Sequence, residues 1–163
     1  MALVNDSASE NGLAAEWLVA AADPDISCEL EAVYQIVRDA VEARGPACWA
    51  SGRCCNFRGT GHLLYVTGLE AAFTLSGSGR TLDPGELEAA ISRGDCPFLT
   101  QNLCGVHGVK PLGCRVYFCD ATAQGWQQDL SERALRMVRG IHDRHGLEYR
   151  YGEWRAMLRR FVV

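Results

Sequence analysis

Hydrophobic residues recur at helical spacing over much of the chain. The first dozen residues are small and polar and are expected to be frayed, and the apolar stretch over residues 13–22 then predicts a short helix. The next helix is marked at both ends, because Asp23 is suited to its N-cap, Pro24 to its first position, and Gly45-Pro46 to its end. Its apolar face consists of Ile26, Leu30, Val33, Tyr34, Val37 and Val41.

Capping residues predict two further helices in the middle of the chain. A short strand is expected over residues 62–66, and Thr67-Gly68-Leu69-Glu70 directly after it has the form of a capping box that begins a helix to about Leu75. Asp83-Pro84 repeats the pairing of an aspartate cap with a proline. It predicts a helix that ends near Gly94.

The C-terminal third contains no cysteine, and its pattern is typical of helices. A long helix is expected to end at Gly146, and a short amphipathic helix to follow it. The apolar face of the long helix consists of Trp126, Leu130, Ala134, Met137, Val138, Ile141 and His145. The short helix presents Trp154, Met157, Leu158 and Phe161.

Two stretches without helical periodicity hold seven of the eight cysteines. The first covers residues 47–61 and the second residues 96–119. The exception is Cys28, which falls within a predicted helix and is expected to pack against its apolar face, since a free cysteine behaves as a small hydrophobic residue. The clustered cysteines are Cys48, Cys54, Cys55, Cys96, Cys104, Cys114 and Cys119.

Composition narrows the chemistry of these cysteines. The chain has 163 residues, 48% of them hydrophobic, which suffices for a core without crosslinks. Its 16 basic and 20 acidic residues are interspersed, which argues against a nucleic-acid partner. No apolar run approaches the roughly 20 residues of a membrane span, so we expect a soluble cytoplasmic protein. In a reducing cytosol, clustered cysteines indicate metal coordination or redox chemistry rather than structural disulfides.

A metal site would have to assemble through tertiary contacts, because the chain has no Cys-x-x-Cys pair. Adjacent Cys54 and Cys55 are expected to point in different directions, so that one of them faces a given metal. Seven thiols exceed the four ligands of a tetrahedral zinc site, which leaves either two sites or some cysteines that bind nothing. Zinc, iron and an iron-sulfur cluster all suit cysteine ligands. Buried free thiols or a redox pair are the alternative to metal.

Residues near the cysteines have less specific roles. His107 could complete a site with three cysteines, although a single loop histidine is more often solvated. Lys110 and Arg115 could donate to thiolate sulfurs and offset their charge, or remain ordinary surface charges. His62, His142 and His145 are even less expected to bind a metal, and the helical pattern places His142 and His145 at surface or edge positions. Four aromatic residues are expected to pack around the site: Trp49, Phe57, Phe98 and Tyr117.

The ordered set of cysteine motifs resembles the YkgJ-like cysteine-cluster family, which is described as zinc- or iron-chelating. The resemblance covers about residues 48–119. The chain departs from the family near Gly52 or Ser51, where the family often has a further cysteine, and at His107 and Lys110. The resemblance implies metal chelation, and the family looks related to a flagellin lysine N-methylase that carries an iron-sulfur cluster. The matching pieces are Cys48 to Cys54-Cys55-Asn56-Phe57, Thr67-x-x-Glu70, Cys96-Pro97-Phe98-Leu99, and the run from Cys104-Gly105-Val106-His107 through Lys110-Pro111-Leu112-Gly113-Cys114-Arg115 to Cys119.

The sequence therefore predicts one mainly α domain over residues 1–163, with irregular cysteine-rich loops, at most a short β-hairpin, and a metal site as its organising centre. The metal-binding core is expected at about 46–120 and a helical part at about 125–163. The expected function is chelation of zinc or iron, with an iron-sulfur cluster included, and the partner is the metal ion, with no nucleic acid or membrane. The alternatives are an iron-sulfur or thiol-dependent enzyme related to methyltransferases, and a zinc-stabilised interaction module. Catalysis is left open.

Overall fold

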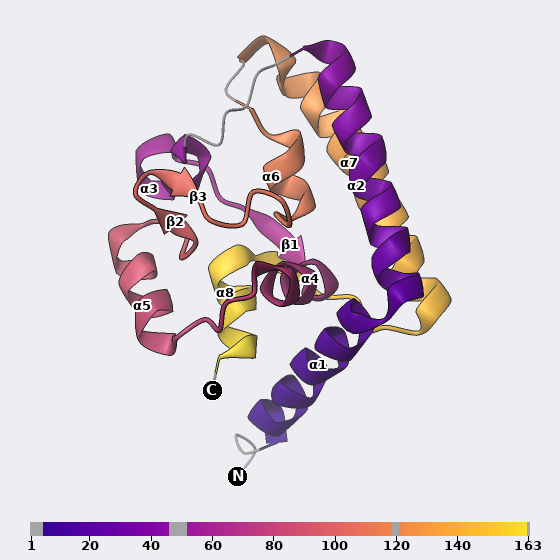
Figure 1. Cartoon of the computed structure of the whole chain (residues 1–163), viewed down its shortest axis with the longest axis vertical. Helices are drawn as coiled ribbons and strands as arrows, with labels where there is room; N and C mark the ends of the chain where they lie inside the picture. The colour runs from indigo at the N-terminus through magenta and orange to yellow at the C-terminus, as the bar shows by residue number, and fades with distance from the viewer. Residues whose placement is uncertain (1–4, 46–51, 119–120, 163) are drawn as a thin grey trace.

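The computed structural model describes residues 5–45, 52–118 and 121–162, and it is mainly helical, as the sequence predicts (Figure 1). The longer helices are α1 (Asn5–Ala22), α2 (Pro24–Arg44), α4 (Gly68–Ser78), α5 (Pro84–Arg93) and α7 (Gln124–His145). The short helices are α3 (Phe57–Thr60), α6 (Leu112–Val116) and α8 (Trp154–Leu158), with 3-10 turns at Arg53–Cys55, Ala121–Ala123 and Arg159–Phe161. The strands are β1 (Tyr65–Thr67), β2 (Leu99–Thr100), β3 (Leu103–Cys104) and β4 (Tyr151–Glu153).

Helices α2 and α7 lie side by side and run in opposite directions along one edge of the molecule (Figure 1). The predicted start of α2 is confirmed, because the Asp23 carboxylate accepts the backbone N–H groups of Asp25 and Ile26 at 2.9 and 3.2 Å. Gly45 ends α2 in the left-handed conformation that glycine tolerates best. At the opposite end of the pair, Glu29 of α2 binds Arg144 of α7. Long helices with complementary apolar faces thus form the stable edge of the fold.

Helix α1 packs against α4 through a large buried aromatic residue. Trp17 is fully buried, and its indole N–H donates to the Glu148 carbonyl at 3.0 Å. At Gly68, the first residue of α4, an added Cβ would come within 2.3 Å of the Trp17 ring, so only glycine permits this approach. Helix α1 begins at Asn5, eight residues earlier than predicted, and the expectation of a frayed N-terminus is wrong from that residue onward.

Two pairs of short antiparallel strands join distant parts of the chain. Strand β1 pairs with β4 in the register Tyr65–Glu153, Val66–Gly152 and Thr67–Tyr151. Strand β1 lies at the end of the predicted 62–66 segment, and β4 was not predicted. The second pair, β2 with β3, is a hairpin within the second cysteine-rich segment. The prediction of at most a short β-hairpin is therefore exceeded, because a further strand pair ties the C-terminal part to α4.

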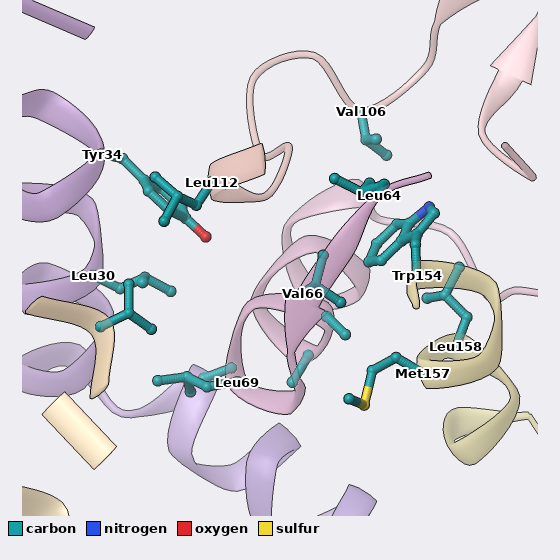
Figure 2. Close-up of a cluster of buried hydrophobic side chains, with 14 of the residues drawn as sticks. Leu30, Tyr34, Leu64, Val66, Leu69, Val106, Leu112, Trp154, Met157 and Leu158 are labelled. Atoms are coloured by element: carbon teal, nitrogen blue, oxygen red, sulfur yellow. The ribbon is translucent and has the colours of Figure 1, made fainter. Parts of the chain in front are cut away.

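The core lies between the α2 and α7 pair and the short C-terminal helix α8. Figure 2 shows part of it, with Leu30 and Tyr34 of α2 on one side and Trp154, Met157 and Leu158 of α8 on the other. Leu64, Val66, Leu69, Val106 and Leu112 fill the space between them. Because Leu112 and Val106 come from the second cysteine-rich segment, that segment is anchored on the core through its apolar residues.

Two side chains, His142 and Met137, differ from their predicted environments. His142 is fully buried rather than at a surface or edge, with Nδ1 3.2 Å from the Glu148 carbonyl and its ring against Tyr149. The α7 pattern missed this because the segment after Gly146 folds back over that turn. Conversely, Met137 is 40% exposed, although it was predicted on the apolar face. His145 is exposed beside Glu29, which agrees with the predicted surface or edge position. Within the described residues, no helix combines the length and the apolar character that crossing a bilayer requires.

Candidate thiol centre

Cys54 and Cys55 lie in a tight 3-10 turn that begins after Gly52. Gly52 has a φ of +73°, and an added Cβ would lie 2.4 Å from the carbonyl oxygen of Asn102. Glycine is therefore required here both for the left-handed conformation and for contact with the hairpin that carries Cys104. After the turn, the Asn56 side chain caps α3 by accepting the Gly59 N–H at 2.8 Å.

Backbone hydrogen bonds join the first cysteine-rich segment to the second. The Cys96 N–H donates to the Cys55 carbonyl at 2.8 Å, and Asn56 forms an isolated antiparallel bridge with Asp95. The Arg58 N–H donates to the Gly94 carbonyl at 3.0 Å. The two segments therefore meet in their described residues, through main-chain bonds as well as through thiols.

Cys104 is placed by the hairpin of β2 and β3. It pairs with Leu99, and the turn between the strands consists of Gln101 and Asn102, both with positive φ, at 49° and 61°. Two such residues form the tight turn that matches the twist of an antiparallel pair. The Leu99 N–H also donates to the Cys96 carbonyl at 3.1 Å, which ties the hairpin to the position of Cys96.

The thiol of Cys55 is the hub of a cluster. Hydrogen bonding with Cys104 first, and then with Cys54 and Cys96, raises the pKa of Cys55, and burial raises it further. Hydrogen bonding from Cys55 lowers the pKa of both Cys54 and Cys104 to about 6, and it also lowers the pKa of Cys96. Cys54 and Cys55 therefore do not point apart as predicted, because the tight turn brings both thiols to the same place.

Cys96 is held by aromatic neighbours in the core. The Trp154 indole N–H donates to the Cys96 sulfur at 3.3 Å, and Phe98 packs against the Trp154 ring at 5.9 Å between centroids. All three side chains are buried, Cys96 with 6% of its surface exposed. Of the predicted aromatic shield, Phe57 and Phe98 are buried, whereas Tyr117 is half-buried and stacks on His62 at 4.2 Å between ring centroids.

Cys114 lies on α6, and the charges of the clustered cysteines affect its pKa. Burial raises the pKa of Cys114 well above its usual value, and the charges of Cys96, Cys54 and Cys104 raise it further. Helix α6 is positioned by the fully buried Glu70, whose carboxylate accepts the Leu112 N–H at 2.8 Å. Glu70 also closes the predicted capping box with Thr67, which is confirmed.

Glu70 was predicted only as a capping residue, and its link to α6 was missed. Its carboxylate accepts the Tyr34 hydroxyl at 3.4 Å as well as the Leu112 N–H. Burial raises the pKa of Glu70. Trp154 was likewise predicted only as a helical apolar residue. The sequence has no local signal for the link from Glu70 to α6 or for the bond from Trp154 to Cys96. The one available hint is general: the polar atoms of a buried glutamate or tryptophan need hydrogen-bond partners.

The charged neighbours act on the thiols through space. The ammonium group of Lys110 contributes to lowering the pKa of Cys54 and Cys104. Arg115 donates to the carbonyls of Lys110 and Gly108 at 2.7 and 3.2 Å rather than to a sulfur. His107 is exposed, with Nε2 3.1 Å from the Lys110 Nζ, and its pKa is lowered by desolvation first and by Lys110 second.

The predicted ligands fall into three groups. Cys54, Cys55, Cys96 and Cys104 share hydrogen bonds and Cys114 lies within their electrostatic field, whereas Cys48 and Cys119, with Trp49, lie outside the described residues. Within residues 5–45, 52–118 and 121–162, no three His, Cys, Asp or Glu side chains are arranged to hold a metal ion as they stand. The thiols are gathered as hydrogen-bonded neighbours and do not form an assembled ligand set.

Cys28 was predicted to pack against the apolar face of its helix, and this is wrong. It is exposed on α2, two residues after the buried Ile26. Two residues turn a helix by about 200°, so Cys28 lies on the side opposite Ile26. Cys28 nevertheless lies apart from the described cysteines of the centre, since within the described residues the thiols that act on Cys55 are those of Cys54, Cys96 and Cys104.

Comparisons with known proteins add no assignment. No protein-family model matches the chain, and neither the curated proteins nor the solved structures contain a match.

Proposed function

We propose that this chain binds zinc or iron, as single ions or as an iron-sulfur cluster, through the thiolates around Cys55. The observation that carries the proposal is the shared hydrogen bonding of Cys55 with Cys54, Cys96 and Cys104. A thiol has one proton, so it cannot satisfy three sulfur acceptors at once. A metal cation can, because it accepts an electron pair from every thiolate that faces it.

The protonation of the cluster favours replacement of the shared proton by a metal ion. Hydrogen bonding with Cys55 lowers the pKa of Cys54 and of Cys104, which favours the thiolate, the form that binds metal. In a tetrahedral site with Zn–S bonds of about 2.3 Å the sulfurs lie about 3.8 Å apart, which is also a hydrogen-bonding separation for sulfur. A metal that replaced the shared proton would convert the cluster into a ligand set and release that proton.

The surroundings suit a site with several negative charges. The Trp154 N–H to the Cys96 sulfur is the kind of outer hydrogen bond that orients a ligand and tunes its basicity. The Lys110 ammonium supplies a nearby positive charge. Cys114, Cys48 and Cys119 are further candidate ligands, and they allow either a second zinc site or the cysteines of a cluster. The resemblance to the YkgJ-like family supports the same proposal.

The test is an anaerobic purification followed by elemental analysis and an absorption spectrum. Zinc would give a colourless protein, whereas an iron-sulfur cluster would give a brown one with acid-labile sulfide. Cys55→Ser should lose most of the metal, because a hydroxyl cannot replace the thiolate at the hub. Cys28→Ser is the matched control, and it should keep the full metal content because Cys28 is exposed on α2.

Two results would count against the proposal. One is a protein that gains no metal from excess zinc or iron under reducing conditions. The other is equal metal content in Cys55→Ser and Cys28→Ser. A pair of thiols that forms a disulfide reversibly, with no metal bound, would instead support redox chemistry in the same cluster.

A further inference from the structure

A hollow of about 470 Å³ lies between α2 and the loop that leads into α6. Its walls include Arg38, Val41 and Glu42 from the helix, and His107, Lys110 and Arg115 from the loop and α6. A second hollow of about 290 Å³ shares Arg38 and Arg115 with it and continues along α2 past Tyr34 and Glu31. Figure 1 shows α6 beside α2, so the hollow lies where the cysteine-rich segment meets the helical edge.

Positive charge is concentrated in the larger hollow. Three permanent cations, Arg38, Lys110 and Arg115, face one carboxylate, that of Glu42. Among the described residues, none of these three cations forms an ion pair with a carboxylate. The pKa of Arg115 is lowered by desolvation first, with a further contribution from the charge of Arg38. The positive charges of Arg38, Lys110 and Arg115 therefore repel each other, and an anion bound between them would reduce this repulsion.

The donors of Arg115 are fixed in position before any ligand arrives. Its Nε donates to the Lys110 carbonyl at 2.7 Å and its Nη2 to the Gly108 carbonyl at 3.2 Å. Its guanidinium carbon lies 4.0 Å from the centre of the Tyr34 ring. An arginine has five N–H donors, so three remain after these two bonds. A guanidinium fixed in this way loses little side-chain entropy when it binds an anion.

Arg38 leaves donors on the opposite wall. Its Nη1 donates to the Gln35 side chain at 2.9 Å, and four of its five N–H groups remain. Lys110 adds an ammonium group whose Nζ lies 3.1 Å from His107 Nε2. Two arginines and one lysine on facing walls are the groups that proteins use for phosphate and carboxylate oxygens, since arginine can bind them with two parallel hydrogen bonds.

We propose that this hollow is a binding site for a small ligand with phosphate or carboxylate oxygens, held between Arg38 of α2 and Lys110 and Arg115 of the loop and α6. The volume is in the range of pockets for small molecules. A ligand bound there lies beside the thiol centre, because Lys110 lines the hollow and also acts on Cys54 and Cys104. Anion binding at this site does not require a metal, so it can be tested independently of the proposed function.

The test is isothermal titration of the purified chain with pyrophosphate and, separately, with citrate at fixed ionic strength. Arg38→Gln removes one cation from the exposed wall of the hollow and should weaken binding by about tenfold or more. Arg133→Gln is the matched control, because it removes the same charge from an exposed position on α7 outside the hollow. It should leave the affinity within about twofold. Helical circular dichroism and metal content of both variants establish that they are folded and equally loaded.

Tight binding of either anion that Arg38→Gln weakens and Arg133→Gln does not would support the site, and the preferred anion would identify the group that it recognises. Two outcomes overturn it: dissociation constants above about 10 mM for both anions, or equal weakening by the two variants, which would show only general attraction to positive charge. Lys110→Gln provides an independent check. It should weaken anion binding to a similar degree, and the proposal fails if this variant binds both anions as the unchanged chain does.

Discussion

The helical edge of the molecule and its thiol centre are stabilised by different means. Helices α2 and α7 bury continuous apolar faces, and α2 has a side-chain cap at its start and a glycine at its end. The thiol centre is assembled from a 3-10 turn, a hairpin with a two-residue turn and the five-residue α6, so no long apolar helix face organises it. Single apolar side chains such as Phe98 and Leu112 anchor it on the core. Main-chain bonds such as Cys96 to Cys55 and the polar links of Trp154 and Glu70 add to its order.

The helical edge is therefore stable without a ligand, whereas the stability of the thiol centre depends on what its thiols bind. Apolar burial at about 25 cal/mol per Å² acts whether or not a ligand is bound. Four thiols that share hydrogen bonds change their protonation and mutual attraction as soon as a metal replaces the shared proton. The two regions should therefore respond differently to core mutations, to chelators and to pH.

The largest effect is expected from a mutation in the helical frame. Trp17→Ala removes a fully buried ring that packs against Gly68 and donates to the Glu148 carbonyl. The free energy of unfolding should fall by about 3–5 kcal/mol. Urea unfolding followed by circular dichroism would measure it, with loss of helical signal across the whole molecule.

Leu18→Ala is the control for Trp17→Ala, because it shortens a neighbouring side chain that is 37% exposed on the same helix. It should cost less than about 1 kcal/mol. Equal losses in the two variants would mean that α1 contributes by helix formation alone and not by packing on α4.

Metal removal is expected to have the next largest effect, and mostly at the thiol centre. Under the proposed function, a chelator should lower the melting temperature by about 5–10 °C, which is a few kcal/mol for a chain of this size. Helical circular dichroism should largely persist, because α2 and α7 do not depend on the thiols. Cys114→Ser should give the same change if Cys114 is a ligand.

The readout for the chelator experiment is thiol alkylation located by mass spectrometry. Buried Cys55 and Cys96 should become reactive only after chelation. Identical melting and identical alkylation with and without chelator would favour buried free thiols over a metal-organised centre.

The sequence predicted the elements that carry local signals. Asp23, Thr67 and Asp83 were each identified as helix caps from their neighbours, and each accepts the predicted backbone N–H. The gathering of the described cysteines was predictable because seven of eight occur in two aperiodic segments. Helix caps and the clustering of cysteines can both be recognised from residues that are close together in the sequence.

Long-range contacts were not predictable in the same way. The burial of His142 depends on a chain reversal beyond Gly146, and the bond from Trp154 to Cys96 spans 58 residues. The exposure of Cys28 depended on choosing the right face of α2, and its closeness to Ile26 in sequence was misleading. The pairing of β1 with β4 likewise joins residues more than 80 positions apart, for which a single sequence has no signal.

Glu70 connects the two regions, so its substitution should produce a smaller, pH-dependent effect. Its two oxygens together accept bonds from Thr67, Leu112 and Tyr34, and Glu70→Gln would present an amide N–H₂ to one set of these donors. We expect the metal-free variant to be less stable by about 1–2 kcal/mol near pH 4.5.

The pH dependence of that difference follows from the raised pKa of Glu70, which burial moves above the ordinary value of 4.5. A carboxyl with a raised pKa in the folded state stabilises the fold most below its unfolded pKa, and the advantage is lost as the pH rises through the folded value. The gap between Glu70→Gln and the unchanged chain should therefore narrow from pH 4.5 upward. Urea unfolding of chelated protein at several pH values measures it, and a gap that widens with pH would contradict the assignment.

The smallest effect is expected from Cys28→Ser, which tests whether the thiols behave as one group. Cys28 is exposed on α2, and its sulfur shares no contact with the described cysteines of the centre, so the free energy of unfolding should change by less than about 0.5 kcal/mol. The number of thiols that react rapidly in the loaded protein should fall by one, because an exposed thiol reacts whether or not the centre is closed. Quantitative alkylation before and after chelation counts both classes. If Cys28→Ser also changed the number released by the chelator, Cys28 would be coupled to the centre, and the separation between the helical edge and the thiol centre would not hold.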